Sequence, residues 1–199
     1  MTQMADLTEE AIKALEEYLK KHPWDYHEEE DIRCLLFREL RKRYDQDFES
    51  GSEKGQLMGQ VHTEFGFKAL EGRKRIDIVV FDKDKIKKKI DERHRKWLVE
   101  REKEMCPLEP SDLIDVIEMD QWASNNIPPL KSKRENQDSK EKQIDRIIQT
   151  KKKLEQLNCR HVRCHLVIVW RDVQDEEQAK AKIEEAKIKG IKVHLIKLP

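Results

Sequence analysis

Three carboxylate side chains lie within two apolar segments whose composition is typical of buried β-strands. They are Asp77 in Arg73–Asp82 (RKRIDIVVFD) and Glu118 and Asp120 in Leu113–Trp122 (LIDVIEMDQW). Alternate side chains of a strand point to opposite faces, so Glu118 and Asp120, two residues apart, point to the same side. A carboxylate that faces a core must be paired, hydrated or bound to a metal ion, because burying an unpaired charge is costly. Two strands that each carry an acid inward therefore indicate a metal site.

The composition predicts a single folded domain with a very polar surface. The chain has 199 residues, of which 41% are charged and 37% hydrophobic, and its 41 basic residues balance its 41 acidic ones. With no net charge, no global field draws the protein onto a polyanion. No apolar run approaches the roughly 18 residues of a membrane span, and the first residues lack the pattern of a signal peptide. We expect a soluble, cytoplasmic protein without a membrane partner.

The apolar periodicity predicts helices and strands that would hold these acids in one sheet. The predicted helices are Leu7–Lys20, His27–Tyr44, Ser139–Leu157 and Asp175–Lys189, the last ended by Gly190, and the predicted strands are Leu57–Phe67, Arg73–Asp82, Leu113–Trp122, Val162–Trp170 and Ile191–Leu198. Residues 1–26 form an N-terminal helical part. Residues 83–110 form an insertion between the second and third strands, because charge pairs at helical spacing favour an exposed helix over Lys83–Met105. Residues 123–137 are predicted to be a loop beside the site, since Pro128 and Pro129 bar regular structure.

A second group of candidate metal ligands lies in the segment NCRHVRCH. It contains Cys159, His161, Cys164 and His165, but their spacing fits no common zinc finger. Cys164 and His165 are also adjacent in a predicted strand and would point to opposite faces. We therefore favour a strand entry with incidental cysteines over a zinc site.

The order of these elements, with an acid on the second strand and the motif Glu118-x-Asp120 on the third, resembles the PD-(D/E)XK nuclease superfamily. The resemblance covers about Glu28 to Trp170. It implies a restriction-endonuclease-like fold, in which an αβββαβ core forms a central mixed sheet flanked by helices. It also implies Mg²⁺- or Mn²⁺-dependent hydrolysis of DNA phosphodiester bonds. Many members of the superfamily act as dimers, so the resemblance allows a homodimer.

The resemblance assigns roles to particular residues. In the superfamily the strand aspartate and the glutamate of E-x-K bind the metal ion, and Asp77 and Glu118 match these positions. The carbonyl group of the residue that follows the glutamate, here Met119, commonly completes the ligand set. Such a metal ion activates water and neutralises charge on the phosphate.

A glutamate on the helix that precedes the strands often joins the site in this superfamily. Glu30 fits this position best, two residues before Ile32, and Glu29 is the second candidate. Glu64 on the first strand is a further acid within reach. Glu30 is accordingly grouped with Asp77, Glu118 and Asp120 as catalytic.

The sequence departs from the superfamily at Asp120, where a lysine is usual. An aspartate cannot donate a hydrogen bond to orient water or to stabilise negative charge, and three interpretations follow. Asp120 is a further metal ligand, or a basic residue from the next loop or helix (Lys131, Lys133 or Lys142) replaces the lysine, or the domain has lost catalysis and kept binding. Lys131, Lys133 and Arg134 (in KSKR) are also the expected contacts to nucleic acid.

Two other functions compete with the nuclease. One is a catalytically inactive module of the same fold that binds nucleic acid or a protein partner. The other is an accessory protein of a toxin or defence system that assembles through the charged helix Lys83–Met105. An ordinary α/β domain in which Arg73, Lys74 or Arg75 neutralises the buried acids also explains Asp77 and Glu118 without a site.

Overall fold

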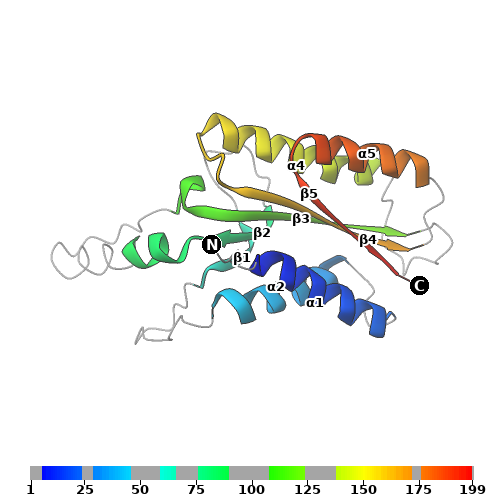
Figure 1. The fold of residues 1–199 in the computed structure, drawn as a ribbon, viewed down its shortest axis with the longest axis horizontal. Helices are drawn as coiled ribbons and strands as arrows, with labels where there is room; N and C mark the ends of the chain where they lie inside the picture. Colours follow the sequence, from blue (N-terminus) through cyan, green and yellow to red (C-terminus); the bar gives the residue numbers. More distant parts are fainter. Residues whose placement is uncertain are drawn as a thin grey trace, which may run out of the picture.

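A computed structural model describes residues 6–23, 29–45, 59–65, 76–89, 108–123, 138–171 and 176–198. In this part of the chain, a five-stranded sheet lies between two layers of helices (Figure 1). The helices are α1 (Leu7–Lys21), α2 (Glu29–Tyr44), α4 (Asp138–Gln156) and α5 (Glu176–Ile188), and the strands are β1 (Val61–Phe65), β2 (Ile76–Phe81), β3 (Leu113–Ala123), β4 (Arg163–Arg171) and β5 (Lys192–Lys197). Residues 83–89 are also helical, and a 3-10 turn, Pro110–Asp112, leads into β3.

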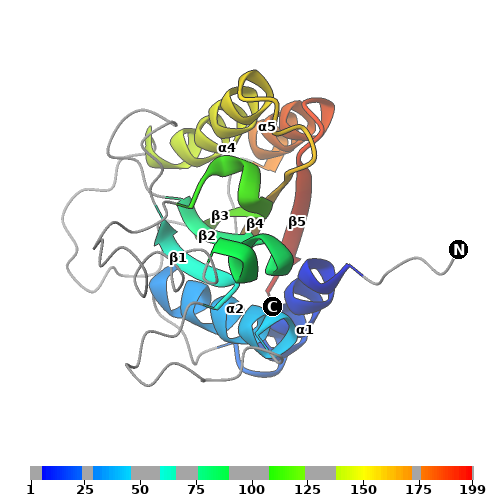
Figure 2. The same cartoon turned by 90° about the vertical axis from the view of Figure 1, so that its left-hand side faces the viewer.

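The sheet is mixed, and its strands follow the order of the sequence from β1 to β5. β1, β2 and β3 form an antiparallel meander, whereas β3, β4 and β5 are parallel. Each parallel connection requires a crossover, which α4 and α5 provide. Both crossovers lead to the next strand in the same direction along the sheet. Because crossovers of this kind have the same hand, both helices lie on one face. Figure 2 shows α4 and α5 on that face and α1 and α2 on the other.

Local sequence explains the two N-terminal helices. Asp6 caps α1, because its side chain accepts hydrogen bonds from the backbone N–H groups of Thr8 and Glu9. In α2 the buried residues recur every four positions, at Ile32, Leu36, Leu40 and Tyr44. Both helices have acidic residues in the first turn and basic residues in the last, which suits the helix dipole.

The predicted α/β class, with a mixed sheet flanked by helices, is confirmed, as are the predicted helices and strands of the described residues. Most ends agree within a few residues. The first strand begins later than predicted, at Val61, and residues 66 and 67 of the prediction lie outside the described residues. The predicted insertion helix is seen at residues 83–89, and residues 90–107 lie outside the described residues. So does the predicted loop, except Ala123, which belongs to β3. No helix in the described ranges is long and apolar enough to cross a membrane.

Gly190 lies just beyond the end of helix α5, and its backbone conformation can be tested by mutation. Gly190 has a φ of +73°, and the N–H groups of Gly190 and Ile191 donate to the carbonyl groups of Lys187 and Ala186. This is the predicted C-cap, a conformation that glycine adopts without steric cost. We expect Gly190→Ala to lower the free energy of unfolding by about 1 kcal/mol, measured by urea titration. Lys189→Ala, at the exposed neighbouring position, is the control, and equal stability of the two variants would contradict the prediction.

Candidate functional site

Three acidic residues occupy one row across β1, β2 and β3. In the antiparallel register, Thr63 pairs with Ile78 and Phe65 with Ile76, so Glu64 lies opposite Asp77. Ile78 pairs in turn with Ile117, and the next position along the same register places Asp77 opposite Glu118. Like charges directly opposite each other destabilise a sheet. A row of this kind needs protons or cations to offset the repulsion.

Burial increases along this acid row (Glu64, Asp77 and Glu118) towards the centre of the sheet. The side chain of Glu64 is 45% exposed, whereas Asp77 retains 6% of its accessible surface and Glu118 retains 2%. Glu64 also has a φ of +49°, in the left-handed region that residues other than glycine rarely adopt. Backbone strain of this type is frequent at functional sites. In β1 this strained conformation occurs at Glu64, the residue that lies beside the other two acids.

Asp77 and Glu118 differ in how their oxygens are satisfied. Oδ2 of Asp77 accepts a hydrogen bond from the backbone N–H of Met119 at 2.8 Å. Oε2 of Glu118 is buried and has no hydrogen-bond partner among the described residues. Burial, followed by the charge of Asp77 and a hydrogen bond with it, raises the pKa of Glu118 well above 4.5, and the charge of Arg146 only partly opposes this. Glu118 therefore remains protonated beside the carboxylate of Asp77.

Arg33 of α2 connects the acid row to the helix layer. Its Nη1 donates to Oε1 of Glu64 at 2.9 Å and to Oδ1 of Asp77 at 3.3 Å, and its Nη2 forms an ion pair with Glu30. The arginine side chain is only 12% exposed. Its buried Nε has no hydrogen-bond partner among the described residues. One guanidinium group thus contacts three carboxylates.

The structure brings together some of the predicted site residues. Asp77, Glu118 and Asp120 are all buried, as the alternation of side chains predicts. Glu30 is linked to the acid row through Arg33, and its own side chain is 57% exposed. The side chain of Met119 packs in the core on the α1 and α2 side, while its backbone N–H holds Asp77.

Other predicted residues lie outside the described part of the chain. These are Arg73, Lys74, Arg75, Lys131, Lys133 and Arg134, together with the side chain of Lys142. Sequence reasoning missed Arg33 and Arg146 as the basic groups beside the acids. Arg33 is three residues after Glu30 and adjacent to the buried Ile32, a helical spacing that could have identified it.

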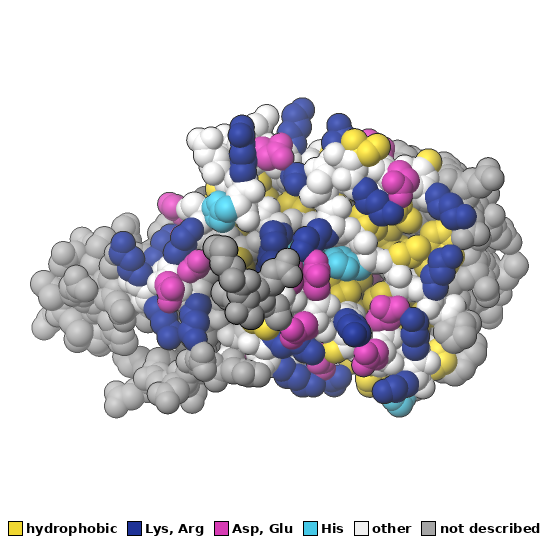
Figure 3. Space-filling view, viewed as in Figure 1, with side chains coloured by type: hydrophobic (Ala, Val, Ile, Leu, Met, Phe, Trp, Pro, Cys, Tyr) yellow, Lys and Arg dark blue, Asp and Glu magenta, His cyan; other side chains and the backbone are white. Residues whose placement is uncertain are grey.

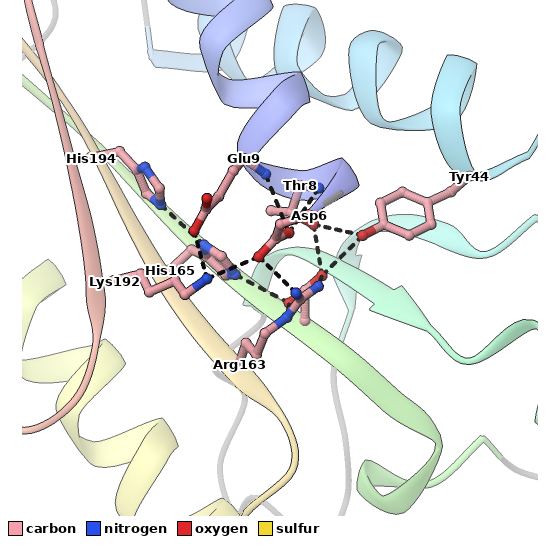
Figure 4. A network of polar contacts seen from close by, with 9 residues as sticks. Asp6, Thr8, Glu9, Tyr44, Arg163, His165, Lys192 and His194 are labelled. Carbon is pink, nitrogen blue, oxygen red and sulfur yellow. Dashed lines mark hydrogen bonds and ion pairs between the residues drawn. The ribbon is translucent and has the colours of Figure 1, made fainter. Parts of the chain in front are cut away.

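A second buried polar cluster lies on the opposite face of the sheet (Figure 4). Its centre is Asp115 of β3, which is fully buried and accepts hydrogen bonds from the hydroxyl groups of Thr8 and Tyr44 at 2.6 and 3.2 Å. Arg163 of β4 donates to both oxygens of Asp115, from Nε at 2.6 Å and Nη2 at 2.7 Å. His165 lies 3.1 Å from Oδ1 of Asp115. Asp115 therefore has partners for both of its oxygens, unlike Glu118.

The same cluster extends to the start of α1. Nη1 of Arg163 donates to Asp6 at 2.7 Å, and the ammonium group of Lys192 on β5 donates to Asp6 at 2.9 Å and to Glu9 at 2.6 Å. These residues join the cap of α1 to two parallel strands. We call the set centred on Asp115 the α1 clamp; it comprises Asp6, Thr8, Glu9, Tyr44, Asp115, Arg163, His165, Lys192 and His194.

The clamp contains two histidines from adjacent strands. Nδ1 of His165 lies 3.1 Å from Nε2 of His194. Burial opposes ionisation of Asp115, but hydrogen bonds from His165 and Arg163 outweigh it and hold the pKa of Asp115 well below 3.8. Because Asp115 is ionised, Nε2 of His165 carries a proton and donates to it. His165 and Cys164 point to opposite faces, as predicted, since Cys164 packs in the core beneath α4 and α5.

Acidic and basic side chains are interspersed on the visible face of the molecule rather than gathered by sign (Figure 3). Lys and Arg side chains lie beside Asp and Glu side chains over most of its described surface. A continuous basic stripe is the usual electrostatic footprint of nucleic-acid binding. The described residues of this face do not form one.

The acid row predicts how the stability of the protein depends on Glu118. Because the pKa of Glu118 is raised in the folded state, its contribution to stability is complete below about pH 4.5 and is lost as the pH rises. We expect Glu118→Gln, which removes this titration, to be more stable than the wild type by at least about 1 kcal/mol at pH 8 but not at pH 4. Urea unfolding at both pH values tests this. Glu17→Gln, on the exposed face of α1, should show no such difference, and a Glu118→Gln variant that is less stable at pH 8 would refute the prediction.

The α1 clamp predicts a pH dependence of the opposite sign. Burial, followed by the charge of His165, lowers the pKa of His194 from 6.5 to about 4. The unfolded chain therefore binds a proton more readily, and stability is lost as the pH falls from about 6.5 towards 4. We expect a loss on the order of 1 kcal/mol between pH 7 and pH 5 that His194→Gln reduces. Chemical denaturation of both proteins at the two pH values measures it; equal losses in wild type and variant would count against the assignment.

The chain was also compared with known proteins. No family model, no curated protein and no solved structure matches it. The function is therefore inferred from the residues and geometry of this chain alone.

Proposed function

We propose that this protein is a metal-dependent phosphodiesterase of the restriction-endonuclease-like type, with DNA as its substrate. The order of the elements supports the proposal: α2 precedes the antiparallel strands β1, β2 and β3, and α4 then crosses over to β4, parallel to β3. This is the αβββαβ order that the superfamily resemblance implies. β5 extends the sheet beyond that core.

The observation that carries the proposal is the buried pair of Asp77 and Glu118. The two carboxyl groups meet on adjacent strands, and Glu118 has a buried oxygen without a partner among the described residues. Two carboxyl groups in contact inside a protein cannot both be ionised unless a cation offsets their repulsion. The pair is therefore held by a proton or by a metal ion, and metal binding would be coupled to loss of the proton.

The residues present fit a hydrated magnesium ion. The described residues contain no group of three His, Cys, Asp or Glu side chains that could hold a metal ion. Mg²⁺, however, usually binds through one or two carboxylates and retains several waters. Asp77 and Glu118 supply those two carboxylates, with the carbonyl group of Met119 as the expected third ligand. When bound, Mg²⁺ makes water more acidic and neutralises charge on a phosphate.

The chain's own residues position this site and set its charge. Met119 fixes Asp77 through its N–H group, and the strand pairing holds Glu118 opposite. Arg33 and Arg146 supply positive charge near the acids, which the acidic residue at position 120 does not provide. We propose that these arginines take over the electrostatic role that the superfamily lysine has towards a phosphate, while Lys131, Lys133 and Arg134 bind the nucleic-acid backbone.

A second candidate function is a catalytically inactive module of the same fold that binds nucleic acid or a protein partner. Two observations favour it: Asp77 is already paired with Arg33, and Asp120 is a buried acid where a lysine is usual. In this case the arginine replaces the metal ion as the permanent counter-charge of the acids.

DNA cleavage distinguishes the two functions. Plasmid and single-stranded DNA are incubated with Mg²⁺, Mn²⁺ or EDTA, using the wild type, Asp77→Asn and Glu118→Gln. We expect metal-dependent nicking that both variants lose, because each removes one of the two carboxylate ligands. Asp145→Asn on the exposed surface of α4 is the matched control and should cleave like the wild type. Absence of cleavage with DNA retained in a gel shift would reject the nuclease and favour the inactive module.

A further inference from the structure

The guanidinium group of Arg33 occupies the position of a counter-cation in the acid row. It contacts Glu64 and Asp77 through Nη1 and Glu30 through Nη2. Arg33 therefore shares one positive charge among three carboxylates. Arg33 and these three carboxylates together carry a net formal charge of −2, so one guanidinium group does not balance the row.

The contact between Arg33 and Asp77 is the weakest of the set. Its length of 3.3 Å exceeds the roughly 2.7–2.9 Å of a good charge-assisted hydrogen bond. The arginine also leaves Nε without a partner among the described residues although that atom is buried. A buried donor without a partner costs free energy. Leaving Asp77 would therefore cost Arg33 little, and its shorter contact with Glu64 can be kept.

The unpartnered oxygen of Glu118 is the independent sign that the acid row accepts a cation. Glu118 is 2% exposed, and Oε2 has no hydrogen-bond partner in the described residues. Within the described part of the chain, the guanidinium group of Arg33 pairs with Glu30, Glu64 and Asp77 and not with this atom. The guanidinium group thus offsets negative charge at the exposed end of the acid row, at Glu64 and Asp77. In the described structure it forms no such pair with Glu118, at the buried end.

We propose that Arg33 is a built-in competitor of the metal ion, which a divalent cation must displace from Asp77 before it binds to Asp77 and Glu118. The inference rests on the proposed metal-binding function and specifies how that site is regulated. A guanidinium group and a divalent ion repel each other strongly in a partly buried site. Metal affinity is therefore set by the competition between the two cations for one carboxylate.

The test is calorimetric titration of the full chain with Mn²⁺ at fixed pH and ionic strength. We expect Arg33→Gln to bind Mn²⁺ at least about tenfold more tightly than the wild type, because the competing charge is gone. Arg38→Gln removes an exposed arginine of the same helix that contacts Glu39, and it should bind like the wild type. Asp77→Asn should abolish the binding event, which identifies the site being titrated. Arg33→Gln affinity equal to or weaker than that of the wild type would overturn the inference.

A second measurement uses the wild type and does not depend on the folding of a variant. The NMR signal of the Arg33 Nε–H group, assigned by its loss in Arg33→Lys, is followed while Mg²⁺ is added. We expect it to shift with the same saturation as metal binding, whereas the Arg38 signal does not move. A stationary Arg33 signal at metal saturation would overturn the inference but leave the proposed function intact. If neither the wild type nor Arg33→Gln binds Mn²⁺ or Mg²⁺, both the inference and the metal-dependent function fail.

Discussion

The free-energy cost of burying carboxyl groups in a β-sheet is the constraint on which the polar interior of this protein depends. A buried carboxylate loses its hydration, and only hydrogen bonds, a proton or a cation can replace it. Asp77 and Glu118 are buried opposite each other in neighbouring strands, so one charge raises the cost of the next. The acid row and its neighbouring arginine are the consequence of this constraint.

The protein solves the same problem in two ways on the two faces of one strand. Asp115 and Glu118 both belong to β3, three residues apart and on opposite faces. Asp115 is surrounded by donors from two helices and from β4, which keep it ionised. Oε2 of Glu118 has no such donor among the described residues, and Glu118 keeps a proton instead. A carboxyl group whose oxygens all have hydrogen-bond partners is suited to stabilising the fold. One with an oxygen that lacks a partner can still bind a ligand.

The sequence alone predicts the sheet and its acids well because the information is local. Alternation within two short apolar segments places Asp77 and Glu118 in the interior, and helical periodicity defines the layers around them. The partner of Asp77 is not local, because Arg33 lies 44 residues away in the sequence. Helical spacing relates Arg33 to Glu30, but no local pattern relates it to Asp77. The sequence likewise gives no sign that Asp115 is the centre of a cluster, because its donors come from a helix and a separate strand that only the complete fold brings together. Predicting which residues pair across elements thus requires the fold, whereas predicting that a single residue is buried does not.

The α1 clamp ties the beginning of the described chain to its end. Asp6 accepts a hydrogen bond from Lys192, 186 residues later, and another from Arg163, 157 residues later. During synthesis, when domains tend to fold from the N-terminus onwards, α1 emerges long before these partners exist. Its capped first turn can form early, but its polar anchorage to the sheet must wait until β4 and β5 have been made. Contacts of such long sequence separation slow folding, and they make completion of the last strand the event that locks the first helix in place.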